Sequence, residues 1–294
     1  MSGIDPRIDL AFKKIFGVEE NKDLLISLIN SIVSEEDQVL DLTLLNPYNV
    51  KNFKNDKLSI LDIKAKGHDG KRFNIEIQIT DEGDYDKRAL YYWAKLYTEQ
   101  ISDKGKYKDL AKTIGIHILN FTSILEAKKY HNIFKIIEDE TGVRYFDNFE
   151  LHTIELQKFI DSVSDEISDI LKNIKNKLDV WVAFLTKYDL LDRHDLPKGL
   201  ENKELKKALD VLSVINLNTE EREFYEDHLK WFRMEESVTT KAREEGREEG
   251  REEGIQIGEA RLIKKMFDSG SSAEVIARIT DLPIAQINKL LNLL

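Results

Sequence analysis

The sequence contains no cysteine, so it forms no disulfide bonds and any metal must be held by oxygen atoms or histidine nitrogens. No apolar run approaches the roughly 18 residues that a membrane-spanning helix needs. No positively charged leader followed by an apolar segment opens the chain. These absences predict a cytoplasmic protein with no membrane partner, which agrees with a reducing compartment.

Basic residues are in deficit, with 44 Lys and Arg against 55 Asp and Glu among 294 residues and a net charge of −11. This balance disfavours a generic nucleic-acid-binding surface, because phosphate contacts require Lys and Arg. Charge is more nearly balanced in the first 120 residues than in the remainder. A nucleic-acid site, if present, is therefore expected as a local basic patch in this first part.

One segment, "SILDIKAKGHDGKRFNIEIQIT" at residues 59–80, predicts a β-hairpin. In its second half Phe73, Ile75 and Ile77 alternate with Asn74 and Glu76. Side chains on a strand point to opposite faces with period two, so this alternation is typical of a half-buried strand. The first half alternates in the same way.

The register of this hairpin follows from its loop. A two-residue loop would set the polar face of one strand beside the apolar face of the other. A three-residue loop at 68–70, ending in a glycine that adopts the left-handed conformation, avoids this conflict. It pairs Lys64 with Asn74 and Asp62 with Glu76.

Two carboxylates that face each other across a hairpin, Asp62 and Glu76, need an explanation, because directly opposed like charges are destabilising. One explanation is a solvated face on which Lys64 neutralises both acids. The other is a divalent cation such as Mg²⁺, which is typically held by one or two carboxylates together with waters and phosphates. The pattern alone leaves both open.

The elements around the hairpin predict an α/β core over residues 1–160. A short helix is expected in "DPRIDLAFKKIFG", because Pro6 is a start signal and Gly17 a stop signal. A long amphipathic helix follows the hairpin at 84–101, and an apolar, β-branched strand follows at 112–121. Two more strands are expected at 131–140 and 149–156.

Beyond the core, the sequence predicts helices throughout. Residues 161–236 form a helical region with apolar stripes. Residues 261–294 predict a tail of three short helices, interrupted at Gly270 and Pro283. A small packing bundle and a DNA-binding helix-turn-helix are both compatible with this tail, but Lys289 is almost the only basic residue of its last helix, which disfavours DNA.

Between these parts, residues 237–260 contain the repeat "REEGREEGREEG". A helix places its glycines along one stripe, and each glycine costs roughly 1 kcal/mol relative to alanine. A second helix packed against the glycine stripe would offset this cost. The repeat therefore predicts a homo-oligomer, against the alternative of a solvated linker helix.

Taken together, "DPRIDLAFKKIFG", "LDIKAKGHDGKRFNIEIQ", "YYWAKLY" and the REEG repeat resemble the Rpn family of recombination-promoting nucleases, also called transposases, of the PD-(D/E)xK superfamily. The resemblance extends over nearly the whole chain. It implies an α/β fold with a restriction-endonuclease-like core, in which helices flank a mixed sheet, followed by an all-helical C-terminal region.

The resemblance also assigns a site. Asp62 matches the first acid of the superfamily motif and Glu76 the second, while Gln78 stands at the position of the lysine and makes this an E-x-Q variant. A Mg²⁺ ion, or Mn²⁺ or Ca²⁺, would bind Asp62, Glu76 and the backbone carbonyl of Ile77. His117, within an apolar strand, is expected to be structural.

Since glutamine at position 78 carries no charge, an active site of this kind would take the positive charge of the missing lysine from another group. Lys64 is the first candidate and Arg88 the second. Asp9 is a candidate acidic ligand from the first helix, against the alternative that it only complements the helix dipole. Arg88 and Lys95 are expected to contact DNA.

These interpretations predict a metal-dependent DNA endonuclease that hydrolyses phosphodiester bonds and is linked to recombination or mobile elements. DNA is the expected partner, and no small-molecule cofactor is expected. Two alternatives remain: a catalytically decayed DNA-binding or assembly protein, and a true transposase that also joins strands.

Overall fold

The computed structural model describes residues 4–48, 63–81, 83–101, 105–164 and 166–291. The chain divides into two compact units, Met1–Phe232 and Arg233–Leu294. No helix in the described ranges is both long enough and apolar enough to cross a bilayer.

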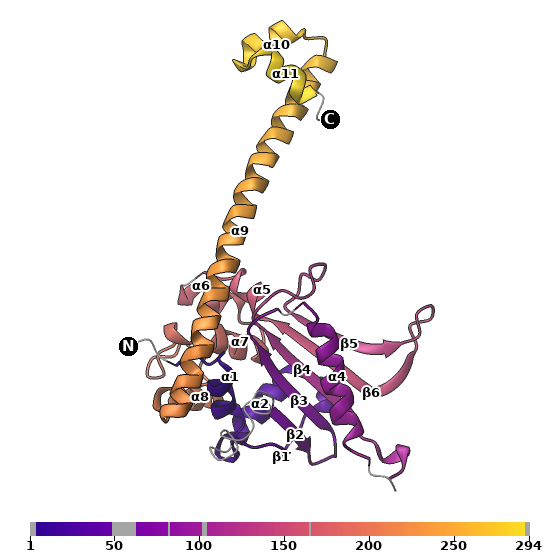
Figure 1. Ribbon diagram of the computed structural model, residues 1–294, viewed down its shortest axis with the longest axis vertical. Helices are drawn as coiled ribbons and strands as arrows, with labels where there is room; N and C mark the ends of the chain where they lie inside the picture. The colour runs from indigo at the N-terminus through magenta and orange to yellow at the C-terminus, as the bar shows by residue number, and fades with distance from the viewer. Residues whose placement is uncertain (1–3, 49–62, 82, 102–104, 165, 292–294) are drawn as a thin grey trace. The chain divides into compact units, whose positions relative to one another are not determined.

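A mixed β-sheet forms the centre of the first unit (Figure 1). Its described strands are β1 (Leu42–Leu44), β2 (Ile63–Gly67), β3 (Arg72–Gln78), β4 (Thr113–Leu119), β5 (His131–Ile137) and β6 (Arg144–Glu155). They lie in the order β1-β2-β3-β4-β6-β5. The pairs β3–β4 and β4–β6 are parallel, and the others are antiparallel. The predicted α/β fold with a mixed sheet is confirmed.

The β2–β3 hairpin has the predicted register. Gly70 closes a three-residue loop with φ of 91°, a left-handed conformation that glycine adopts at no steric cost. Lys64 pairs with Asn74 as expected. Asp62, predicted opposite Glu76, lies outside the described residues.

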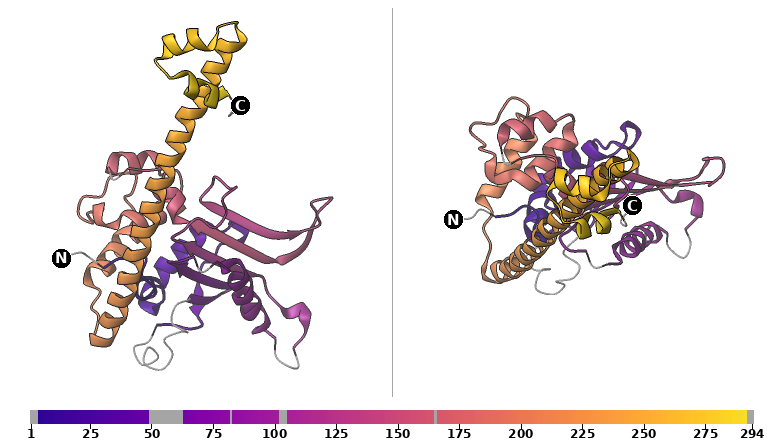
Figure 2. Two further views of the ribbon diagram at one scale, coloured as in Figure 1. Left: turned by 45° about the horizontal axis from the view of Figure 1, so that its top comes forward. Right: turned by 90° about the horizontal axis from the view of Figure 1, so that it is seen from above.

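Helices cover both faces of the sheet. On one face, Phe73, Ile75 and Ile77 contribute to the main hydrophobic core. The opposite face is covered by α4 (Tyr85–Thr98), as Figure 2 shows. Every residue of β3 except its two ends is therefore buried, whereas the alternation predicted a strand buried on one face only.

The remaining helices of the first unit pack into the core. They are α1 (Asp9–Phe16), α2 (Lys22–Ile32), α5 (Leu156–Ile160), α6 (Ile167–Asn173), α7 (Lys177–Lys187) and α8 (Lys203–Val214), with short 3-10 turns η1 (Glu19–Asn21), η2 (Glu35–Asp37), η3 (Tyr107–Asp109) and η4 (Tyr188–Leu190).

The sequence predicts residues 161–236 as a helical region distinct from the α/β core. In the structure, these helices share the hydrophobic interior of that core. Trp181 and Phe184 on α7 contact Phe16 on α1 with ring-centroid distances of 5.4 and 6.4 Å. The apolar side chains of α7 lie around most of its circumference, so the helix needs neighbours on several sides. Helices α2, α5 and α8 are among these neighbours.

The second unit contains the end of a long helix and two short ones. α9 (Thr219–Asp268) begins in the first unit, and α10 (Ala273–Thr280) and α11 (Ile284–Leu291) follow it. Ile263, Ile276 and Ile287 form a small core between the three. The first of the three predicted short helices is thus the end of α9, and the turn that follows it contains Gly270, where φ is 93°.

Candidate active site

The candidate site lies on the face of β3 that α4 covers, around Glu76. This side chain is only 7% exposed. Asn74, on the same face of β3, donates a hydrogen bond from Nδ2 to Glu76 Oε1 at 2.9 Å. The parallel pairing of β3 and β4 sets His117 beside Glu76. A buried carboxylate is thus held between two strands and a helix.

A second acid, Asp9, comes to this site from the first turn of α1. Its side chain is 7% exposed, and its Oδ1 atom is buried with no hydrogen-bond partner among the described residues. Burial, and after it the negative charge of Glu76, raise the pKa of Asp9 to about 7. A helix-dipole role alone does not account for an acid buried beside another acid.

This pair fits a hard cation. A desolvated carboxylate with an unpartnered oxygen is costly, and a divalent ion would satisfy it with the oxygen ligands that Mg²⁺ prefers. Within the described ranges, no three His, Asp or Glu side chains form a complete ligand set. The predicted set includes Asp62, which falls outside those ranges, and the backbone carbonyl of Ile77, which stays a prediction.

Arg88 occupies the neighbourhood of Gln78. It donates from Nη2 to Gln78 Oε1 at 2.9 Å, and its guanidinium lies 5.6 Å from the ring centroid of Tyr85. The amide nitrogen of Gln78 donates to the carbonyl oxygen of Thr80 at 3.3 Å. A positive charge therefore lies next to Gln78.

The other two basic residues that the sequence singles out, Lys64 and Lys95, have different surroundings from Arg88. Lys64 Nζ is 3.6 Å from Glu99 Oε1, at the end of α4 opposite to Arg88, so this ion pair directs its ammonium group away from Gln78. Lys95 is exposed in the last turn of α4. Arg88 is half-buried at the start of the helix, and it is the predicted cation that contacts Gln78.

A tyrosine–histidine pair, which the sequence did not predict, completes the site. The hydroxyl of Tyr85 lies 2.5 Å from His117 Nδ1. Burial, together with His152 and Arg88, lowers the pKa of His117 to about 3, so the ring that shares this hydrogen bond with the tyrosine is neutral. A Cβ atom on Gly115 would lie 3.0 Å from His117 Nε2, so glycine makes room for the imidazole.

The sequence indicates some of the residues around Glu76 but not others. Asn74 shares the polar alternation of the hairpin, and Tyr85 opens the amphipathic helix. The position of His117 depends on the parallel pairing of two strands that are separated by a helix, which residue patterns do not reveal. Trp93 and Leu96 on α4 are buried, whereas Tyr92 is half-buried.

A mixed sheet with acids gathered beside its central hairpin defines a core of the PD-(D/E)XK nuclease class. The sequence model of the PD-(D/E)XK nuclease family transposases matches residues 6–242, and the chain belongs to this family. No curated protein and no solved structure matched the chain. Membership supports nuclease activity on DNA, and nucleases of this class generally use divalent metals.

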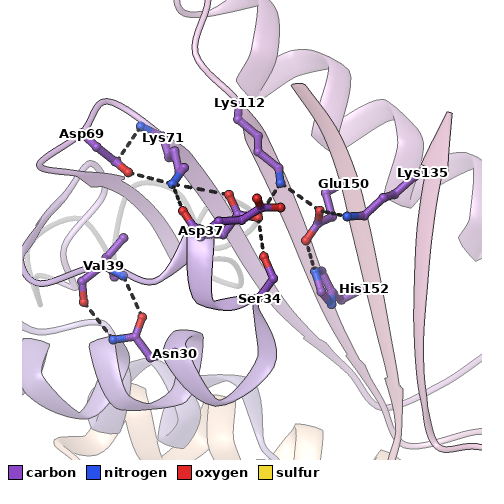
Figure 3. A network of polar contacts seen from close by, with 11 residues as sticks. Asn30, Ser34, Asp37, Val39, Asp69, Lys71, Lys112, Lys135, Glu150 and His152 are labelled. Atoms are coloured by element: carbon purple, nitrogen blue, oxygen red, sulfur yellow. Dashed lines mark hydrogen bonds and ion pairs between the residues drawn. The ribbon is translucent and has the colours of Figure 1, made fainter. Parts of the chain in front are cut away.

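A second network of charged side chains centres on the buried carboxylates of Asp37 and Glu150 (Figure 3). Lys112 Nζ lies 2.5 Å from Asp37 Oδ2 and 2.9 Å from Glu150 Oε2. Lys135 and His152 also contact Glu150, at 3.0 and 2.8 Å. The network ties η2 to the residue that precedes β4 and to strands β5 and β6.

The pKa of Glu150 reflects these contacts. Burial by itself would raise it, but the hydrogen bonds from His152, Lys112 and Lys135 outweigh burial and hold it below its ordinary value. A carboxylate with a lowered pKa stabilises the fold above the ordinary pKa, and this stabilisation is lost as the pH falls towards the lowered value.

We expect E150Q to lower the free energy of unfolding at pH 7 by about 2 kcal/mol, because two half-buried lysines lose a charged partner. At pH 3.5 the difference from wild type should shrink by about 1 kcal/mol, since the ordinary pKa lies near 4.3. Urea unfolding followed by circular dichroism at both pH values measures this. E126Q, at an exposed loop residue, is the control and should behave as wild type.

Proposed function

We propose that the protein is a metal-dependent DNA endonuclease that hydrolyses phosphodiester bonds in recombination or in the movement of genetic elements. The observation that carries the proposal is the burial of Asp9 beside Glu76, with an Asp9 oxygen that has no hydrogen-bond partner among the described residues. Family membership supports the same activity. Stability alone gives no reason to bury two acids together.

In this proposal Asp62, Glu76, the Ile77 carbonyl and Asp9 hold Mg²⁺, with Mn²⁺ or Ca²⁺ as substitutes. The bound ion would lower the pKa of a water ligand and neutralise charge on the phosphoryl oxygens. Asn74 fixes the orientation of Glu76 through its 2.9 Å hydrogen bond. α4 and the sheet exclude bulk water from Glu76, which strengthens its electrostatic interactions.

Arg88 supplies the positive charge in place of the superfamily's lysine. Gln78 cannot titrate, and it accepts a hydrogen bond from Arg88 that positions the guanidinium. Arginine stays protonated and can bind two phosphate oxygens with its planar fork. We assign the charge to Arg88 rather than to Lys64, which pairs with Glu99. Arg88 and Lys95 on α4 then contact the DNA backbone.

Purified protein should nick supercoiled plasmid in the presence of Mg²⁺ or Mn²⁺, and E76Q and D62N should lose this activity by at least about a hundredfold, because each removes a metal ligand. Calorimetric titration with Mn²⁺ gives an independent measure, in which both variants and D9N bind more weakly. Metal binding without cutting would favour a decayed assembly protein. Joining of DNA ends would establish the strand-transferring alternative.

The assignment of Arg88 has its own test. R88A should lose most of its cleavage rate at saturating DNA, because the substituted site lacks a positive charge. The double variant R88A/Q78K should recover at least about tenfold over R88A, since lysine restores that charge at the superfamily's position. R88A/Q78M, which has a side chain of similar length without charge, is the control. Equal activity of the two double variants would assign the charge elsewhere.

We further propose that the REEG segment, residues 237–260, mediates homo-oligomerisation. A Cβ atom added at Gly246, Gly250, Gly254 or Gly258 would meet no atom within 4 Å, so these glycines are not required by contacts inside the chain. Glycine instead lets another backbone approach closely. Arg251 forms an ion pair with Glu248 at 2.6 Å, and both remain exposed enough to contact a neighbouring helix.

Replacing all four glycines by alanine distinguishes association from a linker role. The substitutions should stabilise α9 by roughly 1 kcal/mol each, so a solvated linker would only gain helicity. If the glycine stripe is the contact, the added methyl groups hold the helices apart and the mass measured by light scattering decreases while helicity rises. An unchanged mass would contradict the proposal.

A further inference from the structure

The outer edge of β5 is open in the described part of the chain. β5 stands last in the strand order, and its ladder hydrogen bonds go to β6 on one side. Its other side carries backbone N–H and C=O groups with no strand partner in the described ranges. Such an edge is a template for pairing with a further strand.

Apolar side chains along β5 are exposed on both faces of the sheet. Ile133, Phe134, Ile136 and Ile137 are 52%, 41%, 41% and 55% exposed. Ile133 pairs with His152 and Phe134 with Leu151, so these two neighbours point to opposite faces. A helix docked on one face would leave the other face uncovered, whereas an added strand with its own side chains covers both.

The charges that flank β5 are of opposite sign at its two ends. Lys128 and Lys129 precede the strand, and Asp139 and Glu140 follow it, all four exposed. A parallel copy of the strand would set like charges side by side. An antiparallel copy sets the basic end of one strand beside the acidic end of the other, which makes β5 self-complementary.

We propose that β5 pairs antiparallel with β5 of a second copy of this chain, across a two-fold axis at Phe134. Full overlap of the seven-residue strand requires the axis at its middle residue. The same arrangement brings Lys128 and Lys129, just before the strand, to the turn that holds Asp139 and Glu140 in the second copy. The two sheets become one continuous sheet, and the interface is isologous.

Two features that protect edge strands in other proteins, a lysine and a bulge, are present here. Lys135 is already used within its own sheet, because its Nζ lies 3.0 Å from Glu150 Oε2. The register with β6 shifts between Phe134 and Ile137, which increases the local twist. Two-stranded antiparallel ribbons accommodate strong twist, so neither feature blocks the edge.

The absence of native cysteine makes a direct test possible in the full-length chain. In F134C the two introduced thiols meet at the proposed axis, where Cα atoms of paired residues lie about 4.5–5.5 Å apart and within disulfide range. Mild oxidation should link more than half of the chains on a non-reducing gel. Y107C, at a residue 84% exposed outside β5, is the control. Equal linkage of both variants overturns the proposal.

A charge exchange tests the register. In the F134C background, K128E/K129E and D139K/E140K should each reduce linkage severalfold, because like charges then face each other. An equimolar mixture of the two should recover it as the mixed dimer, in which both ends are complementary. No recovery on mixing would exclude this register.

These readouts separate the strand contact from the glycine stripe of α9. Association through α9 alone would give F134C no advantage over Y107C, which counts against the β5 pairing. A high F134C yield that survives the four glycine-to-alanine substitutions supports it.

Discussion

Burial of the polar face of β3 is the constraint on which the site depends. Glu76 and Asn74 lie under α4, where a carboxylate loses the hydration that would stabilise its charge. Asp9 adds a second acid from α1 to the same dry region. Polar side chains take the place of water around these acids. Asn74 donates a hydrogen bond to Glu76, and the Arg88 guanidinium lies nearby at Gln78.

The hairpin could be predicted in detail because its information is local. Alternation and the position of Gly70 determine which residues face each other, and the structure has Lys64 opposite Asn74 as expected. The choice between Lys64 and Arg88 could not be made in this way. It depends on how α4 lies across the sheet, which brings Arg88 in its first turn to Gln78 and Glu99 at its C-terminal end to Lys64.

Residues 161–236 likewise show that a local sequence pattern does not determine which distant elements pack together. Their apolar stripes were visible, but a stripe does not specify its partner. Composition changes near residue 160, whereas the hydrophobic core does not end there, because Trp181 and Phe184 pack on Phe16 from the first helix. The burial of Asp9 follows from the same packing, since α1 lies between the sheet and these helices.

At Gly115, the stability of strand β4 and the space that His117 needs favour different residues. It sits in β4, an interior strand of the sheet, where glycine is among the weakest strand formers and costs roughly 0.5–1 kcal/mol relative to alanine. Any larger residue would displace the imidazole of His117, whose Nε2 would lie 3.0 Å from an added Cβ atom. Local sheet stability is thus lower at the position that accommodates the Tyr85–His117 pair, and a substitution that strengthened the strand would disturb the neighbours of Glu76.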